Sequence, residues 1–145
     1  MWSKSYSQTV EGVGAADVWK VWADVDRWHE WQDDVELAQL DGAFAKGSTF
    51  RFRPKGGPNV KIEILRCEAP GNFIDLTRFP LARMTGSHDM IERDGRLELR
   101  TTITVEGPLS FLWLRLVAQG VVNSLPAQTQ ALVERAQALK AEARS

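Results

Sequence analysis

The chain has a single cysteine, a single tyrosine and only two histidines among its 145 residues. Because Cys67 stands alone, no disulfide can form within the chain, and a zinc site built from several thiolates is excluded. The chain also has no large excess of either charge, since 18 basic and 19 acidic residues give a formal net charge of -1. The basic excess typical of nucleic-acid binders is therefore absent, and we expect no nucleic-acid partner.

Long hydrophobic runs are also absent. The nearest approach to the ~20 apolar residues of a membrane span lies at 109–122, where Arg115, Gln119 and Gly120 interrupt it. The N-terminus has no apolar core of the kind found in signal peptides. We therefore expect a cytoplasmic protein without stable membrane insertion. A composition of 43% hydrophobic and 26% charged residues predicts one globular domain over 1–145.

The first third of the chain predicts a strand followed by two short helices. Residues 2–11 alternate weakly and favour a strand. Val18, Trp22 and Val25 then recur at helical spacing, with Trp19 beside Trp22, so we expect both indoles to point inward. A second short helix, capped by Asp26, carries Trp28 and Trp31.

From Val35 onward the hydrophobic period changes to two, which predicts strands joined by short turns. Asp94-Gly95 is a strong hairpin signal, and glycine-rich or proline-rich turns separate the other strands. The expected strands cover 35–41, 49–53, 60–64, 73–79, 83–93 and 97–105. With the first strand, this makes about seven antiparallel strands.

A long helix is predicted from Pro108 to Leu139, because strand-like alternation does not recur there and proline suits a first helical turn. Pro126 should kink or split this helix, since proline lacks the amide hydrogen. The expected inward stripe is Leu114, Val117, Val121, Leu132, Ala136 and Leu139. The fold class is thus α+β, a curved antiparallel sheet wrapped on one long C-terminal helix, which tends to leave a hollow between sheet and helix.

This order resembles the helix-grip fold of the START and polyketide-cyclase superfamily, and in particular its bacterial polyketide cyclase/dehydrase and lipid-transport branch. The resemblance is carried by residues 16–28 (ADVWKVWADVDRW) with Trp31, by 47–50 (GSTF), by 105–109 (VEGPL) and by Leu125-Pro126. It covers nearly the whole chain and implies a ligand cavity without naming a ligand.

Strand parity and the expected cavity predict which side chains would contact a ligand. The strands would contribute Phe50, Phe52, Ile62, Ile64, Met84, His88, Met90, Thr101 and Ile103, and the helix Leu116 and Gly120. Arg78 shares its parity with Ile74 and Leu76, so it is a candidate for the cavity mouth, although an exposed strand-end arginine is the more common situation. On this parity Asp75 and Thr77 would belong to the outer face.

His88 is the candidate of greatest chemical interest, because an imidazole facing the cavity can transfer protons or bind a ligand carbonyl. A buried histidine satisfied by a neighbouring group is the structural alternative. No acidic partner for His88 is evident from the sequence.

His29 is expected at the surface. No metal-ligand spacing, nucleophile elbow, dinucleotide fingerprint or phosphate loop occurs, so we expect neither a metal nor a cofactor.

Three functions are compatible with these features. The first is binding of a small hydrophobic or aromatic molecule between the sheet and the C-terminal helix. The second is a cyclase, aromatase or dehydratase that uses His88. The third is a protein-interaction module that recruits a partner through the apolar helix surface, because 111–117 is apolar almost all round. A homodimer through the same helix, with Trp113 as its anchor, is a separate expectation.

Overall fold

The computed structural model describes residues 1–144, and Ser145 lies outside the described residues. Seven antiparallel strands form one sheet in the order β1-β7-β6-β5-β4-β3-β2. Its strands are β1 (Trp2–Val10), β2 (Val35–Asp41), β3 (Thr49–Pro54), β4 (Val60–Glu68), β5 (Asn72–Phe79), β6 (Ala82–Arg93) and β7 (Arg96–Glu106). The α+β class, the seven-stranded antiparallel sheet and the long C-terminal helix predicted from the sequence are confirmed.

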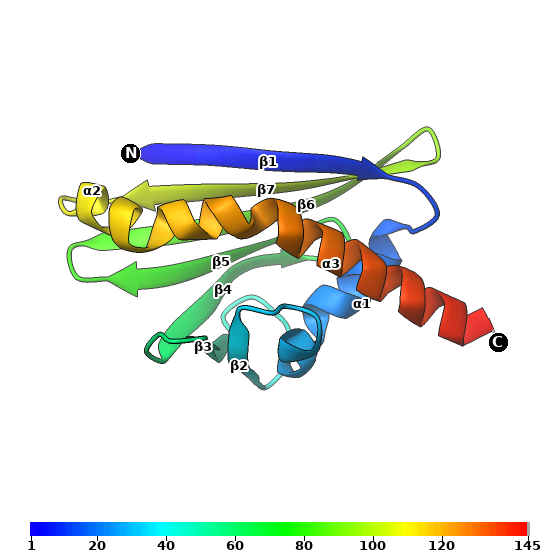
Figure 1. Ribbon diagram of the computed structural model, residues 1–145, viewed down its shortest axis with the longest axis horizontal. Helices are drawn as coiled ribbons and strands as arrows, with labels where there is room; N and C mark the ends of the chain where they lie inside the picture. Colours follow the sequence, from blue (N-terminus) through cyan, green and yellow to red (C-terminus); the bar gives the residue numbers. More distant parts are fainter. Residues whose placement is uncertain (145) are drawn as a thin grey trace.

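The helical part has two pieces that are far apart in the sequence. After β1 come α1 (Ala15–Ala23) and the 3-10 helix η1 (Val25–Glu30). After β7 a continuous helical segment comprises α2 (Ser110–Trp113), the π-helical turn η2 (Leu114–Ala118) and α3 (Gln119–Arg144). Figure 1 shows α3 lying across the sheet, beside β1 and β7, with its second half over α1.

The two faces of the sheet differ in character. The inner face, turned toward α1 and α3, carries buried side chains such as Phe50, Ile64, Phe73 and Leu99. The outer face carries charged residues such as Lys61 and Arg78. Beta-bulges interrupt the pairing between Val35 and Leu37 and between Ile64 and Arg66. A bulge bends a strand and increases the local twist, which curves the sheet around the helices.

Two clusters of apolar side chains make up the core. The larger one joins α1 and η1 to the sheet through Trp22, Trp28 and Trp31. Trp28 donates its indole Nε1–H to the Trp22 carbonyl at 3.0 Å, so the larger cluster also contains a buried hydrogen bond. The smaller cluster joins β7 to the beginning of the C-terminal helix through Ile103, Val105 and Leu125.

The N-terminus of α1 is fixed to the sheet by hydrogen bonds. Asp17 accepts from the Gly14 amide at 2.8 Å, which satisfies one of the free donors at the start of the helix. Glu92 of β6 accepts from the Ala15 amide at 2.6 Å. These contacts place the Trp19 and Trp22 side of α1 against the sheet, as the helical spacing predicts.

Two glycines provide a matched test of this architecture. Gly107 joins β7 to α2 with φ +116°, and a Cβ there would lie 2.6 Å from the Leu81 carbonyl oxygen. Gly120 lies in α3, where a Cβ would meet nothing within 4 Å. We predict that Gly107→Ala lowers the free energy of unfolding by about 2 to 4 kcal/mol through strain and overpacking.

Gly120→Ala is the control, and it should raise the free energy of unfolding by up to about 1 kcal/mol because alanine favours the helix. Urea denaturation of both variants measures these changes. Equal effects of the two substitutions would contradict the described packing of Gly107 on the β5–β6 turn.

Candidate functional site

The chemically distinctive feature of the inner face is a buried pair formed by His88 of β6 and Asp75 of β5. His88 Nε2 lies 2.8 Å from Asp75 Oδ2, and His88 is 7% exposed. A carboxylate has no proton to donate, so His88 Nε2 carries the proton and Asp75 accepts it. His88 Nδ1 is then left as a buried nitrogen without a hydrogen-bond partner among the described residues.

Aromatic rings enclose this pair. Phe73 stacks on the His88 ring with centroids 4.3 Å apart and 14° between the planes. Trp22 contacts the same imidazole at 4.8 Å from the helix side. Gly86 lies opposite Asp75 in the strand register, and a Cβ there would approach Asp75 Oδ1 to 2.9 Å. The absence of a side chain at position 86 therefore leaves the space that the pair occupies.

The pair corrects the predicted parity of β5. Phe73 faces Trp22 and His88, and Asp75 bonds His88, so the odd-numbered residues of β5 lie on the inner face. Asp75 and Thr77 were expected on the outer face, and Thr77 is instead buried at 4% exposure. The alternation was ambiguous because Phe73, Ile74 and Leu76 place apolar side chains on both faces of the strand.

Arg78 consequently lies on the outer face and does not border a sheet–helix cavity. Its side chain is 68% exposed and forms an ion pair with Glu63 of β4 at 2.9 Å. Arg78 does share a face of β5 with Ile74 and Leu76, as predicted. That face is the outer face of the sheet and not the inner face. Arg78 is therefore a surface residue.

The two residues predicted from the helix are also misplaced. Leu116 is 64% exposed and Gly120 is exposed, so neither faces the sheet. Leu114, Ala118 and Leu125 face the smaller core cluster instead. The π-helical turn at Leu114–Ala118 shifts the phase of the helix, and the almost uniformly apolar segment before it supplies no periodic signal.

The nine predicted strand residues share the inner face, as their register with β5, β6 and β7 requires. They differ in burial. Six pack closely with 7% exposure or less, and these are Phe50, Ile64, His88, Met90, Thr101 and Ile103. The other three, Phe52, Ile62 and Met84, are only half-buried. The inner face is therefore closely packed near its centre, and its half-buried residues lie on β3, β4 and β6.

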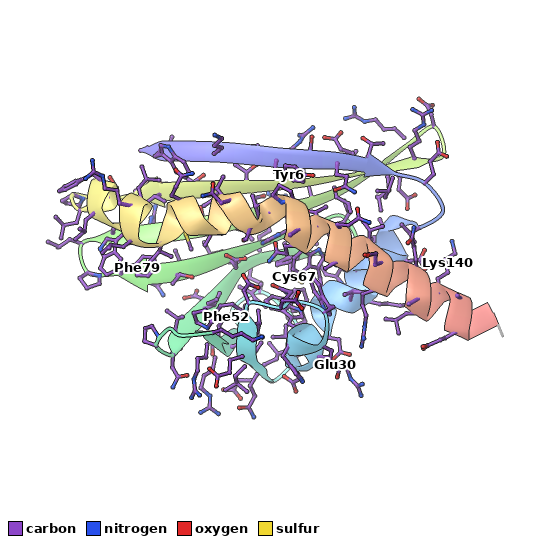
Figure 2. The ribbon with its side chains drawn as sticks, in the orientation of Figure 1. Tyr6, Glu30, Phe52, Cys67, Phe79 and Lys140 are labelled. Carbon is purple, nitrogen blue, oxygen red and sulfur yellow. The ribbon has the colours of Figure 1, made fainter. Side chains whose placement is uncertain are left out.

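Part of the inner face lies to one side of α3. The long helix packs chiefly against β1, β7 and α1. In the view of Figure 2, Phe52 of β3 lies to one side of α3 and not beneath it. Phe52 and Ile62 are partly buried and pack against the larger core cluster.

Surface hollows occur at other places as well. The largest of those described here, about 530 Å³, lies at the β2–β3–β4 edge and has mostly polar walls that include Gln39, Arg51 and Lys61. A smaller hollow of about 210 Å³ lies between the η1–β2 connection and α3. Sequence reasoning did not identify the smaller one, because its walls come from segments about 100 residues apart.

Trp113 does not serve as a free surface anchor. It stacks on Phe79 at 4.5 Å and donates its indole N–H to the Pro80 carbonyl at 3.0 Å. Its neighbours Phe111, Leu112 and Leu116 are exposed. A homodimer through this helix stays a prediction, and its anchor would have to be these neighbours.

Other features bear on the chemistry of the described residues. Burial raises the pKa of the Cys67 thiol, and its Sγ donates to the Phe44 carbonyl at 3.4 Å. His29 is exposed, as expected.

Within residues 1–144 we find no cluster of three or more His, Cys, Asp and Glu side chains that could hold a metal ion. None of the helices in that range is long and apolar enough to cross a membrane.

A curved antiparallel sheet around one long C-terminal helix, with two short helices after the first strand, defines a helix-grip protein. The family model "Polyketide cyclase / dehydrase and lipid transport" matches residues 1–143. The chain therefore belongs to this family, as the sequence resemblance predicts. Among curated proteins, nothing matches the chain significantly.

Solved structures with the same fold come from several bacteria. Hypothetical protein jhp0584 from Helicobacter pylori superposes with a TM-score of 0.75 at 14% identity, over 92% of this chain and 87% of that one. A START superfamily protein from Mycobacterium smegmatis superposes with a TM-score of 0.67 at 14% identity, over 93% of this chain and 98% of that one. The di-domain ARO/CYC StfQ from the steffimycin biosynthetic pathway superposes with a TM-score of 0.70 at 15% identity, over 98% of this chain and 52% of that one. At these identities the likeness establishes the fold alone.

A double-mutant cycle tests the His88–Asp75 contact. His88→Phe leaves the partly buried Asp75 carboxylate without its partner, which should lower the free energy of unfolding by about 1 to 3 kcal/mol. Adding Asp75→Leu removes the unpaired charge, so the double variant should recover most of that loss. Thermal or urea unfolding of the four proteins measures the coupling. Additive effects would mean that the two side chains do not interact.

Proposed function

We propose that this protein binds a small, largely apolar molecule that contains a ring, against the inner face of the sheet beside α3. Membership of a family described by cyclase, dehydrase and lipid-transport activities supports a small-molecule ligand. The half-buried Phe52 and Ile62 supply apolar surface beside α3. Burial of such surface is worth about 25 cal/mol per Å², so apolar contact would provide most of the affinity.

The observation that carries the proposal is the buried His88–Asp75 pair with its unpartnered Nδ1. A polar pair within an aromatic wall is a weak source of stability, because well-packed apolar residues of similar volume often do as well. An unpaired buried nitrogen costs a further 1 to 3 kcal/mol or so. A ligand hydroxyl that donates to Nδ1 would remove this cost once the rings of Trp22 and Phe73 move apart to admit it, so His88 is the group we expect to orient the ligand.

Adjacent positions on β4 offer a direct test of which face binds. Ile62 is a half-buried inner-face residue, and Lys61 is an exposed outer-face residue. With the neutral dye Nile red as probe, the native protein should show saturable, blue-shifted emission. Ile62→Trp fills the proposed site and should weaken dye binding at least about tenfold, or 1.4 kcal/mol.

Lys61→Trp is the control, because it adds the same ring to the same strand on the other face. Dye binding by this variant should match that of the native protein. Absence of saturable binding, or an equal response of the two variants, would contradict the proposal. Native mass spectrometry of freshly purified protein offers an independent readout, since a resident ligand appears as added mass.

The same pair favours a second candidate function, proton-transfer catalysis on a polyketide-like substrate. Asp75 holds the proton on Nε2, which leaves Nδ1 as a lone pair able to accept a proton from a carbon next to a carbonyl. Loss of that proton generates an enolate, the nucleophile of an aldol ring closure, and the protonated imidazole can then assist loss of water. In this function His88 is the catalytic residue and Asp75 is a positioning residue.

Kinetics with a poly-β-ketone mimic separate this function from passive binding. We predict that His88→Gln lowers kcat by about 10²- to 10⁴-fold, the usual contribution of a general base. Asp75→Asn should lower kcat while leaving KM nearly unchanged, because it alters the orientation and tautomer of His88 and not the apolar walls. Unchanged turnover in His88→Gln would dismiss the proposed base.

A further inference from the structure

Four exposed apolar side chains gather at one end of the molecule, and we call them the apolar tip. Leu81 belongs to the β5–β6 turn, and Phe111, Leu112 and Leu116 belong to α2 and η2. Leu81 and Phe111 are each 65% exposed. Figure 1 shows this turn and α2 at the same end of the molecule. Exposed apolar groups that cluster in this way mark contacts with a partner or a membrane.

The fold holds the two parts of the apolar tip together. The Leu109 amide donates to the Leu81 carbonyl at 3.0 Å, and the Trp113 indole donates to the Pro80 carbonyl at 3.0 Å. Trp113 also stacks on Phe79, so its ring packs on the end of β5 while its neighbours on the helix stay exposed. The apolar tip is therefore one rigid surface and not a set of independent side chains.

Leu81 has a backbone conformation that leucine rarely adopts. Its φ is +57°, in the left-handed region that favours glycine and asparagine. Because the side chain is exposed, its burial within the chain does not offset the cost of this conformation. Backbone strain of this kind clusters at functional positions. The strain therefore indicates that the leucine side chain serves a contact outside the chain.

The exposed side of the C-terminal helix changes character along its length. Its first exposed positions are Phe111, Leu112, Arg115 and Leu116, whereas the later ones are polar or glycine. Arg115 is also the only charged residue of 107–133. An apolar face that carries a cation and is confined to the first turns suits contact at the beginning of the helix, and not along its whole length.

The charge around the apolar tip is positive. Arg78 and Arg83 lie directly opposite each other on β5 and β6, next to the turn, and like charges in this position destabilise a sheet. Each forms an ion pair at the surface, Arg78 with Glu63 and Arg83 with Glu106. Exposed pairs contribute little, so phosphate oxygens can compete for both guanidinium groups. Arg115 adds a further cation from the helix, so the arginines outnumber the glutamates.

The opposite sign prevails elsewhere in the molecule. Residues 11–36 include α1 and η1, and their only lysine and arginine are Lys20 and Arg27 among many acidic residues. Figure 1 shows α1 beside the second half of α3, away from α2. A net charge of -1 is thus divided unevenly, and this distribution would orient the apolar tip toward a negatively charged surface.

We propose that the apolar tip docks this protein reversibly on an anionic lipid surface. The four apolar side chains enter the interfacial layer, and Arg78, Arg83 and Arg115 contact lipid phosphates. A second copy of the chain fits this surface less well, because a two-fold contact would bring Arg115 against arginines of the same sign. The docking does not depend on the proposed function, although it would place the protein where apolar molecules accumulate.

Flotation with lipid vesicles tests the docking. The protein is mixed with vesicles of equimolar phosphatidylcholine and phosphatidylglycerol, or of phosphatidylcholine alone, and the bound fraction gives a partition coefficient. We expect the protein to bind the anionic vesicles at least about tenfold more strongly, because each arginine near the surface adds a favourable contribution. Added salt should weaken this binding by screening.

Two double variants test the contribution of the apolar side chains. Phe111→Ser with Leu116→Ser should lower binding to the anionic vesicles at least about tenfold, because two apolar groups no longer enter the interface. Leu37→Ser with Leu139→Ser is the matched control, since it removes two leucines that are exposed elsewhere, and binding should be unchanged. Arg115→Gln should lower binding to the anionic vesicles about fivefold and leave binding to phosphatidylcholine unchanged. Circular dichroism establishes that each variant is folded.

Leu81→Gly separates binding from stability. Glycine adopts a positive φ without strain, so the variant should have a higher midpoint of urea denaturation than the native protein. It should also bind the anionic vesicles at least about threefold more weakly, because an apolar side chain is lost. A purely structural role of Leu81 would not change stability and vesicle binding in opposite directions.

Equal binding of the anionic vesicles by the native protein and the Phe111/Leu116 double variant would overturn the docking, and so would a lack of binding by the native protein. Light scattering that shows a dimer, converted to a monomer by the same double variant, would also overturn it, because the apolar tip would then join two copies. Nile red binding is measured without vesicles, so failure of the docking leaves the proposed function standing.

Discussion

The indole of Trp22 contacts four other rings, and the arrangement of the candidate site depends on these contacts. Trp28, Trp31 and Phe73 lie 5.2 to 5.5 Å from it, and His88 lies at 4.8 Å. The edge-on geometry of the three aromatic pairs is favourable beyond simple burial of area. Through this one residue α1 is joined to η1 and to the inner face of the sheet. The same residue also joins the His88–Asp75 pair to Trp31.

This apolar setting determines what the polar groups can do. In water a histidine–aspartate contact contributes little, but within an aromatic wall each unpaired atom carries a substantial free-energy cost. Three buried side-chain atoms have no hydrogen-bond partner among the described residues, namely the Nδ1 of His88, the Nε2 of Gln32 and the Oδ1 of Asn72. The Nδ1 of His88 is an acceptor when Asp75 holds the proton on Nε2. A ligand that carries a hydroxyl on an apolar framework would complement it.

The sequence predicted most of the fold and only part of the site, for physical reasons. Helical spacing correctly placed Trp19 and Trp22 inward, and Asp94-Gly95 correctly predicted the β6–β7 hairpin. Where apolar side chains occupy both faces, as in β5, alternation cannot assign parity, so Asp75 was not recognised as the partner of His88. The phase of the helix near Leu116 was hidden by a π-helical turn, which leaves no periodic signal. The Gln32–Gln128 contact joins residues 96 apart and has no local signature.

The most direct test of the account is a long-range ¹H–¹⁵N NMR spectrum of the His88 imidazole, recorded before and after saturation with Nile red. The account predicts that in the free protein Nε2 of the ring carries the proton that Asp75 accepts. On binding, the Nδ1 resonance should move because its surroundings change. Saturable dye binding that leaves both His88 nitrogen resonances in place would contradict the claim that the ligand is held beside this buried pair.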